Sequence, residues 1–492
     1  MFHRILIVAA AIVVTLAATT AQADHSALAE HPLVASNLRM LEVWLQAEMD
    51  YRDQPGYVIG IVYDQQLIYA KGFGYADVAS KRPMTTDTLF HIGSQSKTFT
   101  AIAVLQLQEQ GKLRLDDPVA KYIPGFAVKN GDNTSTPVTI FQLLTHTSGL
   151  MSEGTKTLHW SDLDFPTREH IDAQIKSGDL AFLPGTKRKY SNLGYTLAGQ
   201  IVERVSGKPF KDYVTENILI PLQMQSTYVE LPKERRARLA TGYGRRMPDG
   251  QREVIPFWDA QGMTSAFGLF STASDLAKYV AWQMRLSEAR DKEILEPTTM
   301  RSMQRVQWVD PEWKEGWGLG FHVVHRPQGE LVGHLGQVPG YFSTTYRDPQ
   351  RKLAVIVLTN SMDAQPYLGQ PRSIPERVFD WVGPAIARAA KKEVVTPLPP
   401  LWKQIEGTYR CMWADLHVMA LDDKFVVVDP NEQDPKATAM TLQPMEGRDW
   451  VFRVVDGPDK QLVGEELRFE LAPDGQTVTS AVCNSARWKR LP

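Results

Sequence analysis

A charged, proline-rich segment near the C-terminus divides the sequence into two parts of different character. Residues 391–400 begin with two lysines and a glutamate and contain three prolines, a composition typical of a linker. The residues before it mix helical periodicity with short β-rich runs, whereas residues 401–492 contain only short strand-like runs separated by polar turns. We therefore expect an α+β domain in residues 24–390, a linker in 391–400 and an all-β domain in 401–492.

The C-terminal part is expected to form a small antiparallel barrel or sandwich. The two cysteines of the chain, Cys411 and Cys483, lie near its two ends. If the strands close into a barrel, the first and last strands are neighbours, and a disulfide between these residues is then a possible pairing. In the chain-entropy model such a bridge would stabilise the fold by about 4 kcal/mol. Two unpaired thiols remain the alternative, because the sequence does not give the distance between the Cα atoms.

The larger part starts with an expected β-hairpin. Residues 58–63 and 66–70 are strand-like runs, and Asp64 and Gln65 form the turn between them. Helical segments follow, and further strand-like runs occur between residues 318 and 359. This order predicts an antiparallel sheet that is completed by both ends of the domain and flanked by helices.

The first residues have the pattern of a secretory signal peptide. Arg4 precedes an apolar run over residues 5–18, and Ala21-Gln22-Ala23 provides the small residues that a signal peptidase recognises. The run is shorter than the ~20 residues needed to span a bilayer. We expect cleavage after Ala23 and a periplasmic or secreted protein without a membrane anchor. A net charge of -2 gives no indication of nucleic-acid binding.

A serine and a lysine three residues apart open the most apolar helical stretch of the chain. Ser94-Gln95-Ser96-Lys97 leads into an apolar run that ends at Gly111, so Ser94 and Lys97 share one face of the first helical turn. The positive end of the helix dipole and burial both favour a neutral lysine amine. Such an amine can accept the proton of a serine hydroxyl, which is otherwise a weak nucleophile. Taken alone, the pattern also fits a helix cap with a surface lysine.

Two further motifs follow in a specific order. Tyr190-Ser191-Asn192 precedes a helical run, and His334-Leu335-Gly336 lies in a strand-like segment. Together with residues 143–150 and 268–276, these motifs resemble the serine β-lactamase and penicillin-binding protein family, in particular its class C-like branch of β-lactamases, esterases and D-amino-acid peptidases. The resemblance covers most of residues 40–360 and implies the β-lactamase and transpeptidase type of α+β fold.

The resemblance also implies roles for individual residues. Ser94 would be acylated by an amide or ester carbonyl, while Lys97 and Tyr190 exchange its proton and pass one to the leaving group. Asn192 would orient Lys97 and contact the substrate. The backbone N–H groups of Ser94 and Gln337 would form the oxyanion hole.

The third motif departs from the family's usual Lys-Thr-Gly. His334, which occupies the first place, could hold a proton beside Tyr190 and so tune the phenol. Gly336 would let the substrate backbone approach the strand. Leu335 stands where many members have a hydroxyl residue that binds a substrate carboxylate, and its side chain cannot donate a hydrogen bond. This change argues against a β-lactamase or a carboxypeptidase.

Other polar and aromatic residues have less specific interpretations. His146 is assigned to the scaffold, and residues 187–189 to a solvated basic turn, with binding of an anionic substrate or an effect on Tyr190 as the alternatives. Three tryptophans could line a cleft or belong to the core: Trp308, Trp313 and Trp317. No residue spacing indicates a metal site or a phosphate loop, so we expect no cofactor.

These observations favour an exported serine hydrolase that acts on a peptide or a small molecule. The leading hypothesis is a peptidase or amidase, whose substrates could contain D-residues, with the C-terminal domain shaping the cleft. A carboxylesterase is the first alternative, and a β-lactamase is the second. A penicillin-binding sensor without turnover would be expected to lack Lys97 or Tyr190, and both are present. The sequence is silent on the oligomeric state.

Overall fold

The computed structural model describes residues 27–128, 137–153, 157–364, 367–370, 372–395, 398–399 and 402–492. The expected signal peptide in residues 1–23 lies outside these ranges, as do three residues of the expected linker, 396, 397 and 400. The chain forms two compact units, one made of Pro55–Tyr367 and the other of Met1–Gln54 together with Leu368–Pro492. Among the described residues, no helix combines the length and the apolar character that crossing a bilayer requires.

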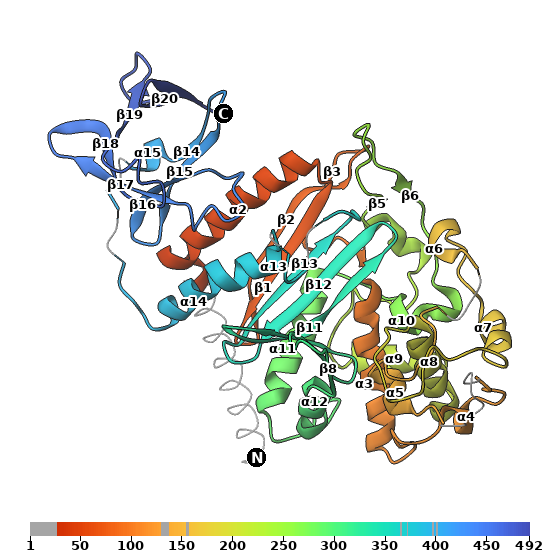
Figure 1. The fold of residues 1–492 in the computed structure, drawn as a ribbon. Coiled ribbons are helices and arrows are strands. Elements are labelled where there is room, and N and C mark those ends of the chain that lie inside the picture. The colour runs from red at the N-terminus through yellow and green to blue at the C-terminus, as the bar shows by residue number, and fades with distance from the viewer. Residues whose placement is uncertain are drawn as a thin grey trace, which may run out of the picture. The chain divides into compact units, whose positions relative to one another are not determined.

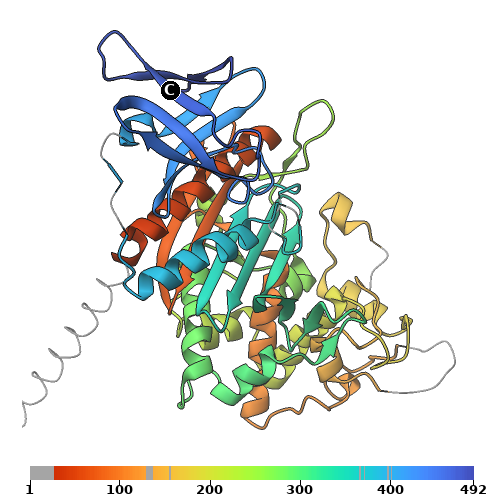
Figure 2. The ribbon, with the colours of Figure 1, turned by 60° about the vertical axis from the view of Figure 1, so that its left-hand side comes forward.

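The first unit is built on a nine-stranded antiparallel sheet in the order β3-β2-β1-β13-β12-β11-β10-β9-β8 (Figures 1 and 2). Its strands are β1 (Gly56–Tyr63), β2 (Gln66–Asp77), β3 (Arg82–Pro83), β8 (Trp308–Val309), β9 (Glu315–Trp317), β10 (His322–Arg326), β11 (Gly329–Val338), β12 (Tyr341–Asp348) and β13 (Leu353–Thr359). Strand β1 from the start of the unit pairs with β13 from its end, with Ile59 opposite Val357. The prediction of a sheet completed by both ends of the domain is therefore confirmed.

The hairpin of β1 and β2 has the predicted turn. Tyr63 and Gln66 pair across a two-residue loop, and the loop residues Asp64 and Gln65 have φ angles of 40° and 73°. Positive φ at both central positions is the conformation of a type I′ turn, whose twist matches that of the flanking strands.

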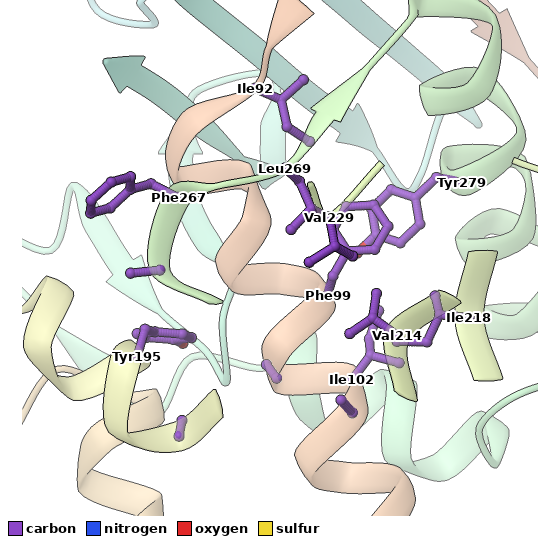
Figure 3. Close-up of a cluster of buried hydrophobic side chains, with 14 of the residues drawn as sticks. Ile92, Phe99, Ile102, Tyr195, Val214, Ile218, Val229, Phe267, Leu269 and Tyr279 are labelled. Atoms are coloured by element: carbon purple, nitrogen blue, oxygen red, sulfur yellow. The ribbon is translucent and has the colours of Figure 1, made fainter. Parts of the chain in front are cut away.

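The helix that follows the candidate nucleophile is buried along almost its whole length. In α3 (Ser96–Glu109), every residue from Ser96 to Leu107 is buried. Helices α8 (Asn192–Ser206) and α10 (Thr264–Phe267) pack against α3, while α11 (Ala273–Glu288) packs against β1, β2 and β13. Phe99 of α3 stacks on Tyr279 of α11 with ring centroids 4.4 Å apart (Figure 3). Close packing on all sides fixes α3, and with it the residues of its first turn.

The remaining elements of the first unit are short. They are α4 (Val119–Tyr122), α5 (Ile140–Leu144), α6 (His159–Asp162), α7 (Arg168–Gln174), α9 (Phe210–Val214), α12 (Pro297–Gln304), the turns η1 (Gly93–Gln95), η2 (Thr215–Leu219), η3 (Lys233–Arg238) and η4 (Gln261–Met263), and the strand pairs β4 (Phe90–His91) with β7 (Phe270–Ser271) and β5 (Gly242–Tyr243) with β6 (Val254–Ile255).

The second unit contains a closed eight-stranded barrel, which confirms the predicted all-β domain. Its strands are β14 (Gly407–Arg410), β15 (Asp415–Leu421), β16 (Lys424–Val428), β17 (Met440–Met445), β18 (Arg448–Asp456), β19 (Glu466–Leu471), β20 (Val478–Cys483) and β21 (Ala486–Arg490). Strand β14 pairs with β21, as expected for the first and last strands of a barrel. The same unit includes α2 (Pro32–Arg52), α13 (Ile374–Arg377), η5 (Val378–Val382), α14 (Gly383–Ala390) and α15 (Trp402–Ile405).

Polar side chains attach helix α2 to the barrel within this unit. The buried Asn37 of α2 donates from Nδ2 to Asp422 Oδ1 at 2.7 Å and accepts at Oδ1 from Lys436 Nζ at 2.5 Å. Both ends of the Asn37 amide are thus paired with barrel residues, which joins α2 to the barrel within this compact unit.

Cys411 and Cys483 are free thiols, so the suggested disulfide is wrong. Arg410, next to Cys411, pairs with Lys489 of β21, and Lys489 pairs in turn with Ser480 of β20. Strand β21 therefore lies between the two cysteines, which places them about 9.5 Å apart or more, at two strand spacings. Disulfides need Cα atoms within about 7 Å. The first and last strands are indeed neighbours, but Cys483 ends the penultimate strand.

Candidate active site

Ser94 lies on a tight turn that two hydrogen bonds of Ser96 hold in place. The turn η1 leads directly into α3, and Gly93 adopts a φ of 54°. Ser96 Oγ donates to the Gly93 carbonyl at 2.7 Å and accepts from Leu269 N at 3.0 Å. Ser94 itself remains partly exposed at the start of the buried helix. The turn thus presents one reactive hydroxyl on a rigid support.

The Lys97 amine is fully buried and has three polar contacts. Its Nζ lies 3.0 Å from Ser94 Oγ, 2.7 Å from Asn192 Oδ1 and 2.8 Å from the Ala266 carbonyl oxygen. An ammonium has three N–H donors, and these contacts satisfy all of them. A neutral amine has two donors and a lone pair. Because Asn192 Oδ1 and the Ala266 carbonyl oxygen can only accept, they take the two N–H groups, and the lone pair faces the Ser94 hydroxyl.

Burial makes the neutral form of Lys97 accessible near neutral pH. Desolvation lowers the pKa of Lys97 to about 7, against an opposing effect of the Glu153 charge. A substantial fraction of the molecules therefore carries a neutral Lys97 amine near neutral pH. The geometry and the pKa together allow Lys97 to take a proton from Ser94.

Tyr190 also contacts Ser94, as a neutral phenol. Its hydroxyl is hydrogen-bonded to Ser94, and burial raises its pKa well above the usual value. The ring stacks on His146 with centroids 4.3 Å apart, and Lys97 Nζ lies 4.8 Å from the ring centroid. His146 Nδ1 also accepts a hydrogen bond from Ser191 N at 3.1 Å. His146 is thus part of the scaffold, as expected, and this scaffold holds the tyrosine.

Asn192 connects Lys97 to a carboxylate that the sequence did not indicate. Asn192 is the first residue of α8, and it donates from Nδ2 to Glu153 Oε1 at 2.8 Å. Glu153 Oε2 lies 3.3 Å from Nε2 of the buried His159. Glu153 follows the family-like segment 143–150, but a single glutamate there has no pattern that distinguishes it from a surface residue.

Contrary to expectation, His334 is a neutral imidazole and carries no second proton near neutral pH. Burial is the main reason that its pKa falls to about 3, and the positive charge of Lys97 lowers it further. Its Nδ1 lies 2.5 Å from the Leu335 carbonyl oxygen and must donate to it, which leaves Nε2 as an acceptor. The His334 ring centroid is 6.4 Å from that of Tyr190. A neutral imidazole therefore faces the tyrosine.

Gly336 allows a close contact with the protein's own backbone. A Cβ atom at this position would lie 2.0 Å from the Ile92 carbonyl oxygen and 2.5 Å from Ser343 Oγ. The space above Gly336 is therefore occupied by the segment that leads into η1. The expected contact of Gly336 with a substrate backbone stays a prediction.

The same contact brings the expected oxyanion donors together. A Cβ atom at Gly93 would lie 3.1 Å from Gln337 N, so this nitrogen lies beside the turn that carries Ser94. Strand β11 and η1 are in contact along this edge. Two backbone N–H groups on neighbouring rigid elements are the usual construction of an oxyanion hole.

The family model described as Beta-lactamase matches residues 41–376 of this chain. The chain belongs to the Beta-lactamase family. This is a family of serine hydrolases, and Ser94, Lys97 and Tyr190 all lie within the matched region.

Known relatives of this Beta-lactamase-family chain are similar over most of its length. Penicillin-binding protein 4* of Bacillus subtilis (strain 168) is 28% identical over 352 residues, which cover 66% of this chain and 74% of that protein. Further curated relatives, the flp proteins of Staphylococcus aureus, are matched over 59% to 64% of their own length.

Two solved structures have a similar fold. The octameric penicillin-binding protein homologue from Pyrococcus abyssi is 26% identical with a TM-score of 0.59, and the alignment covers 92% of this chain and 99% of that one. A D-stereospecific amidohydrolase from Streptomyces sp. is 24% identical with a TM-score of 0.55, covering 65% of this chain and 94% of that one.

One residue of the basic turn lies against the site of this Beta-lactamase-family chain. The Arg188 guanidinium stacks on the Trp317 ring, 4.0 Å from its centroid, and Trp317 meets the Tyr190 ring edge-on at 5.9 Å. Arg188 is thus no solvated surface residue, and its charge counteracts the effect of burial on the pKa of Tyr190. Of the three tryptophans, Trp317 contacts the site, Trp308 pairs with it across β8 and β9, and Trp313 is exposed.

Proposed function

We propose that this protein is a serine hydrolase that forms an acyl-enzyme on Ser94 and hydrolyses amide bonds in peptides, including peptides with D-residues. The observation that carries the proposal is the Lys97 amine, whose two fixed acceptors direct its lone pair to the Ser94 hydroxyl. A serine hydroxyl needs such a base to become nucleophilic at neutral pH.

In the proposed reaction, each proton has a defined donor and acceptor. The neutral Lys97 amine takes the Ser94 proton while Oγ attacks the substrate carbonyl, and the N–H groups of Ser94 and Gln337 receive the developing oxyanion. Tyr190 then donates its proton to the leaving nitrogen and regains one from the Lys97 ammonium. In the second half, Lys97 accepts a proton from the attacking water and returns it to Ser94 Oγ as the acyl bond breaks.

The proposed substrate class is supported by Leu335 of strand β11 and by the known relatives. Leu335 offers no hydroxyl to a substrate carboxylate, which argues against β-lactams and C-terminal carboxylates as preferred ligands. The relatives include penicillin-binding proteins, and one fold neighbour is described as a D-stereospecific amidohydrolase. A carboxylesterase would use the same acyl-enzyme, so the choice between amide and ester depends on measurement. We also propose export through the N-terminal segment, on the sequence pattern alone.

A panel of substrates tests the proposal. Wild type and Ser94→Ala are assayed with D- and L-aminoacyl anilides, p-nitrophenyl esters and nitrocefin. We expect anilide hydrolysis by the wild type and its loss in Ser94→Ala. If only the esters are hydrolysed, the protein is an esterase and the proposed amidase activity is wrong. Full activity of Ser94→Ala on every hydrolysed substrate would contradict the assignment of the nucleophile, and stable acylation without turnover would indicate a sensor.

A further inference from the structure

Glu153 is held rigidly at the end of a chain of contacts that begins at the nucleophile. One carboxylate oxygen, Oε1, accepts from Asn192 Nδ2 at 2.8 Å, and the other, Oε2, lies 3.3 Å from His159 Nε2. The His159 side chain is 1% exposed, and its Nδ1 is 3.0 Å from Thr157 Oγ1. With both oxygens engaged, Glu153 has a fixed position beside Asn192.

We propose that Glu153 is a positioning residue, which fixes the orientation of the Asn192 amide and supplies a negative charge to the buried Lys97 amine. This inference rests on the proposed function, since it concerns the base of the same reaction.

The orientation of the Asn192 amide matters because its two ends have opposite hydrogen-bonding character. The oxygen only accepts and the NH₂ group only donates, although the two ends have nearly the same shape. Glu153 can only accept, so it binds the NH₂ group and leaves Oδ1 for Lys97. If the amide were reversed, its NH₂ group would face Lys97 Nζ and donate to the amine lone pair. That lone pair would then be lost to Ser94.

The charge of Glu153 matters because the histidines and tyrosines around Lys97 are neutral. Burial lowers the pKa of His334 to about 3 and that of His146 well below its usual value, and it raises the pKa values of Tyr190 and Tyr195. Two neutral imidazoles and two neutral phenols therefore surround the amine. Arg188, the nearby cation, acts on the two histidines and on Tyr190.

Glu153 thus has two separable effects on Lys97. Its charge opposes the desolvation of the ammonium and keeps the pKa of Lys97 from falling further. Its hydrogen bond sets the direction of Asn192. A glutamine at position 153 keeps an oxygen that can bind the Asn192 NH₂ group but removes the charge, whereas an alanine removes both.

The test is the rate at which a fluorophosphonate labels Ser94 between pH 5 and pH 9, followed by intact mass, with Ser94→Ala as the blank. Labelling rises with pH as Lys97 loses its proton. In Glu153→Gln we expect this rise to move to lower pH by about one unit, with a rate at high pH within about threefold of wild type. In Glu153→Ala we expect a rate at least tenfold lower at every pH.

Glu330→Gln is the matched control. Glu330 also pairs with a histidine, His325, at 3.1 Å, but it lies on the β10–β11 hairpin and has no contact with Lys97 or Asn192 among those described. Its pH profile is expected to match the wild type. Thermal melting shows whether each variant is folded, and if Glu153→Ala is not, the profile of Glu153→Gln decides.

The outcomes separate the inference from the proposed function. An unlabelled wild type would overturn both. A labelled wild type with an unchanged pH profile in Glu153→Gln would overturn the role of the charge, and a wild-type rate in a folded Glu153→Ala would overturn the role in positioning. A merely structural Glu153 would lower the melting temperature without moving the profile.

Discussion

At the scale of single residues, the roles proposed for Lys97 and Tyr190 rest on the effect of burial on an amine and on a phenol. Burial favours the neutral form of both groups, so the lysine can accept a proton and the tyrosine keeps one to donate. Both groups contact Ser94, so the same hydroxyl meets an acceptor and a donor.

Tyr190→Phe tests the donor role. Amide cleavage needs a proton on the leaving nitrogen, whereas p-nitrophenolate leaves without one. We expect kcat/KM for anilides to fall by about 10²- to 10³-fold and that for p-nitrophenyl esters to fall by less than tenfold. Equal losses on both substrates, measured by steady-state kinetics, would contradict the assignment of Tyr190 as the donor to the leaving group.

The buried His91 is expected to make the protein sensitive to acid. Its ring lies between Trp258 and Phe270, at centroid distances of 4.2 and 4.3 Å, and burial lowers its pKa to about 3. The unfolded chain binds a proton at His91 below about pH 6.5, whereas the folded chain does not until about pH 3. As the pH falls from about 6.5 to about 3, His91 therefore lowers the free energy of unfolding by about 1.4 kcal/mol per pH unit.

His91→Phe removes the titrating group and keeps an aromatic ring between Trp258 and Phe270. Urea unfolding at pH 7.5 and pH 5 should show a smaller loss of stability on acidification than in the wild type, by about 2 kcal/mol. The same loss in both proteins would show that His91 is not the group responsible.

At the scale of elements, the contact between β11 and η1 sets the geometry of the site. The Ile92 carbonyl oxygen occupies the place where a side chain at Gly336 would begin, 2.0 Å from an ideal Cβ atom. Any side chain there would separate the strand from the turn that carries Ser94.

Gly336→Ala is therefore expected to lower both stability and activity. We expect a loss of about 1–3 kcal/mol in the free energy of unfolding and at least a tenfold lower rate of Ser94 labelling. Gly60→Ala in β1 is the control, because a Cβ atom there meets Ile356 at an ordinary 3.5 Å. A Gly336→Ala variant that behaves like Gly60→Ala would contradict the role of this contact.

The sequence predicted those parts of the site that depend on local spacing or on family motifs. Ser94 and Lys97 are three residues apart at a helix start, and Asn192 follows Tyr190 closely, so their juxtaposition could be expected. Glu153 could not be found in this way, because its contact with Asn192 joins segments 39 residues apart. The neutral state of His334 and the close contact at Gly336 depend on burial, which only the packed structure shows.

At the scale of the whole molecule, the sheet and the barrel could be predicted from the sequence, because the hairpin, the spacing of the strand-like runs and the proline-rich segment indicate them. The sequence did not predict that α2 belongs to the same compact unit as the barrel. This assignment rests on contacts such as those of Asn37 with Asp422 and Lys436, nearly 400 residues apart. Such long-range polar pairs leave no periodic pattern in the sequence.

Removing residues 391–492 tests whether α2 depends on the barrel. Without the barrel, the Asn37 amide loses its two barrel partners and keeps only the Leu33 carbonyl oxygen of its own helix, and the side of α2 that contacts β15 loses its packing. We expect a lower melting temperature and faster hydrogen exchange in α2 than in the full chain, measured by mass spectrometry. Unchanged exchange in α2 would show that the barrel does not stabilise this helix.

The position of β21 between the two cysteines also bears on how this chain reaches its folded state. Since Cys411 and Cys483 lie on opposite sides of that strand, the native structure forms without a covalent cross-link. No oxidant or isomerase is needed, and no step in refolding has to wait for thiol exchange, which takes seconds to hours. The fold should therefore be equally accessible in reducing and in oxidising surroundings.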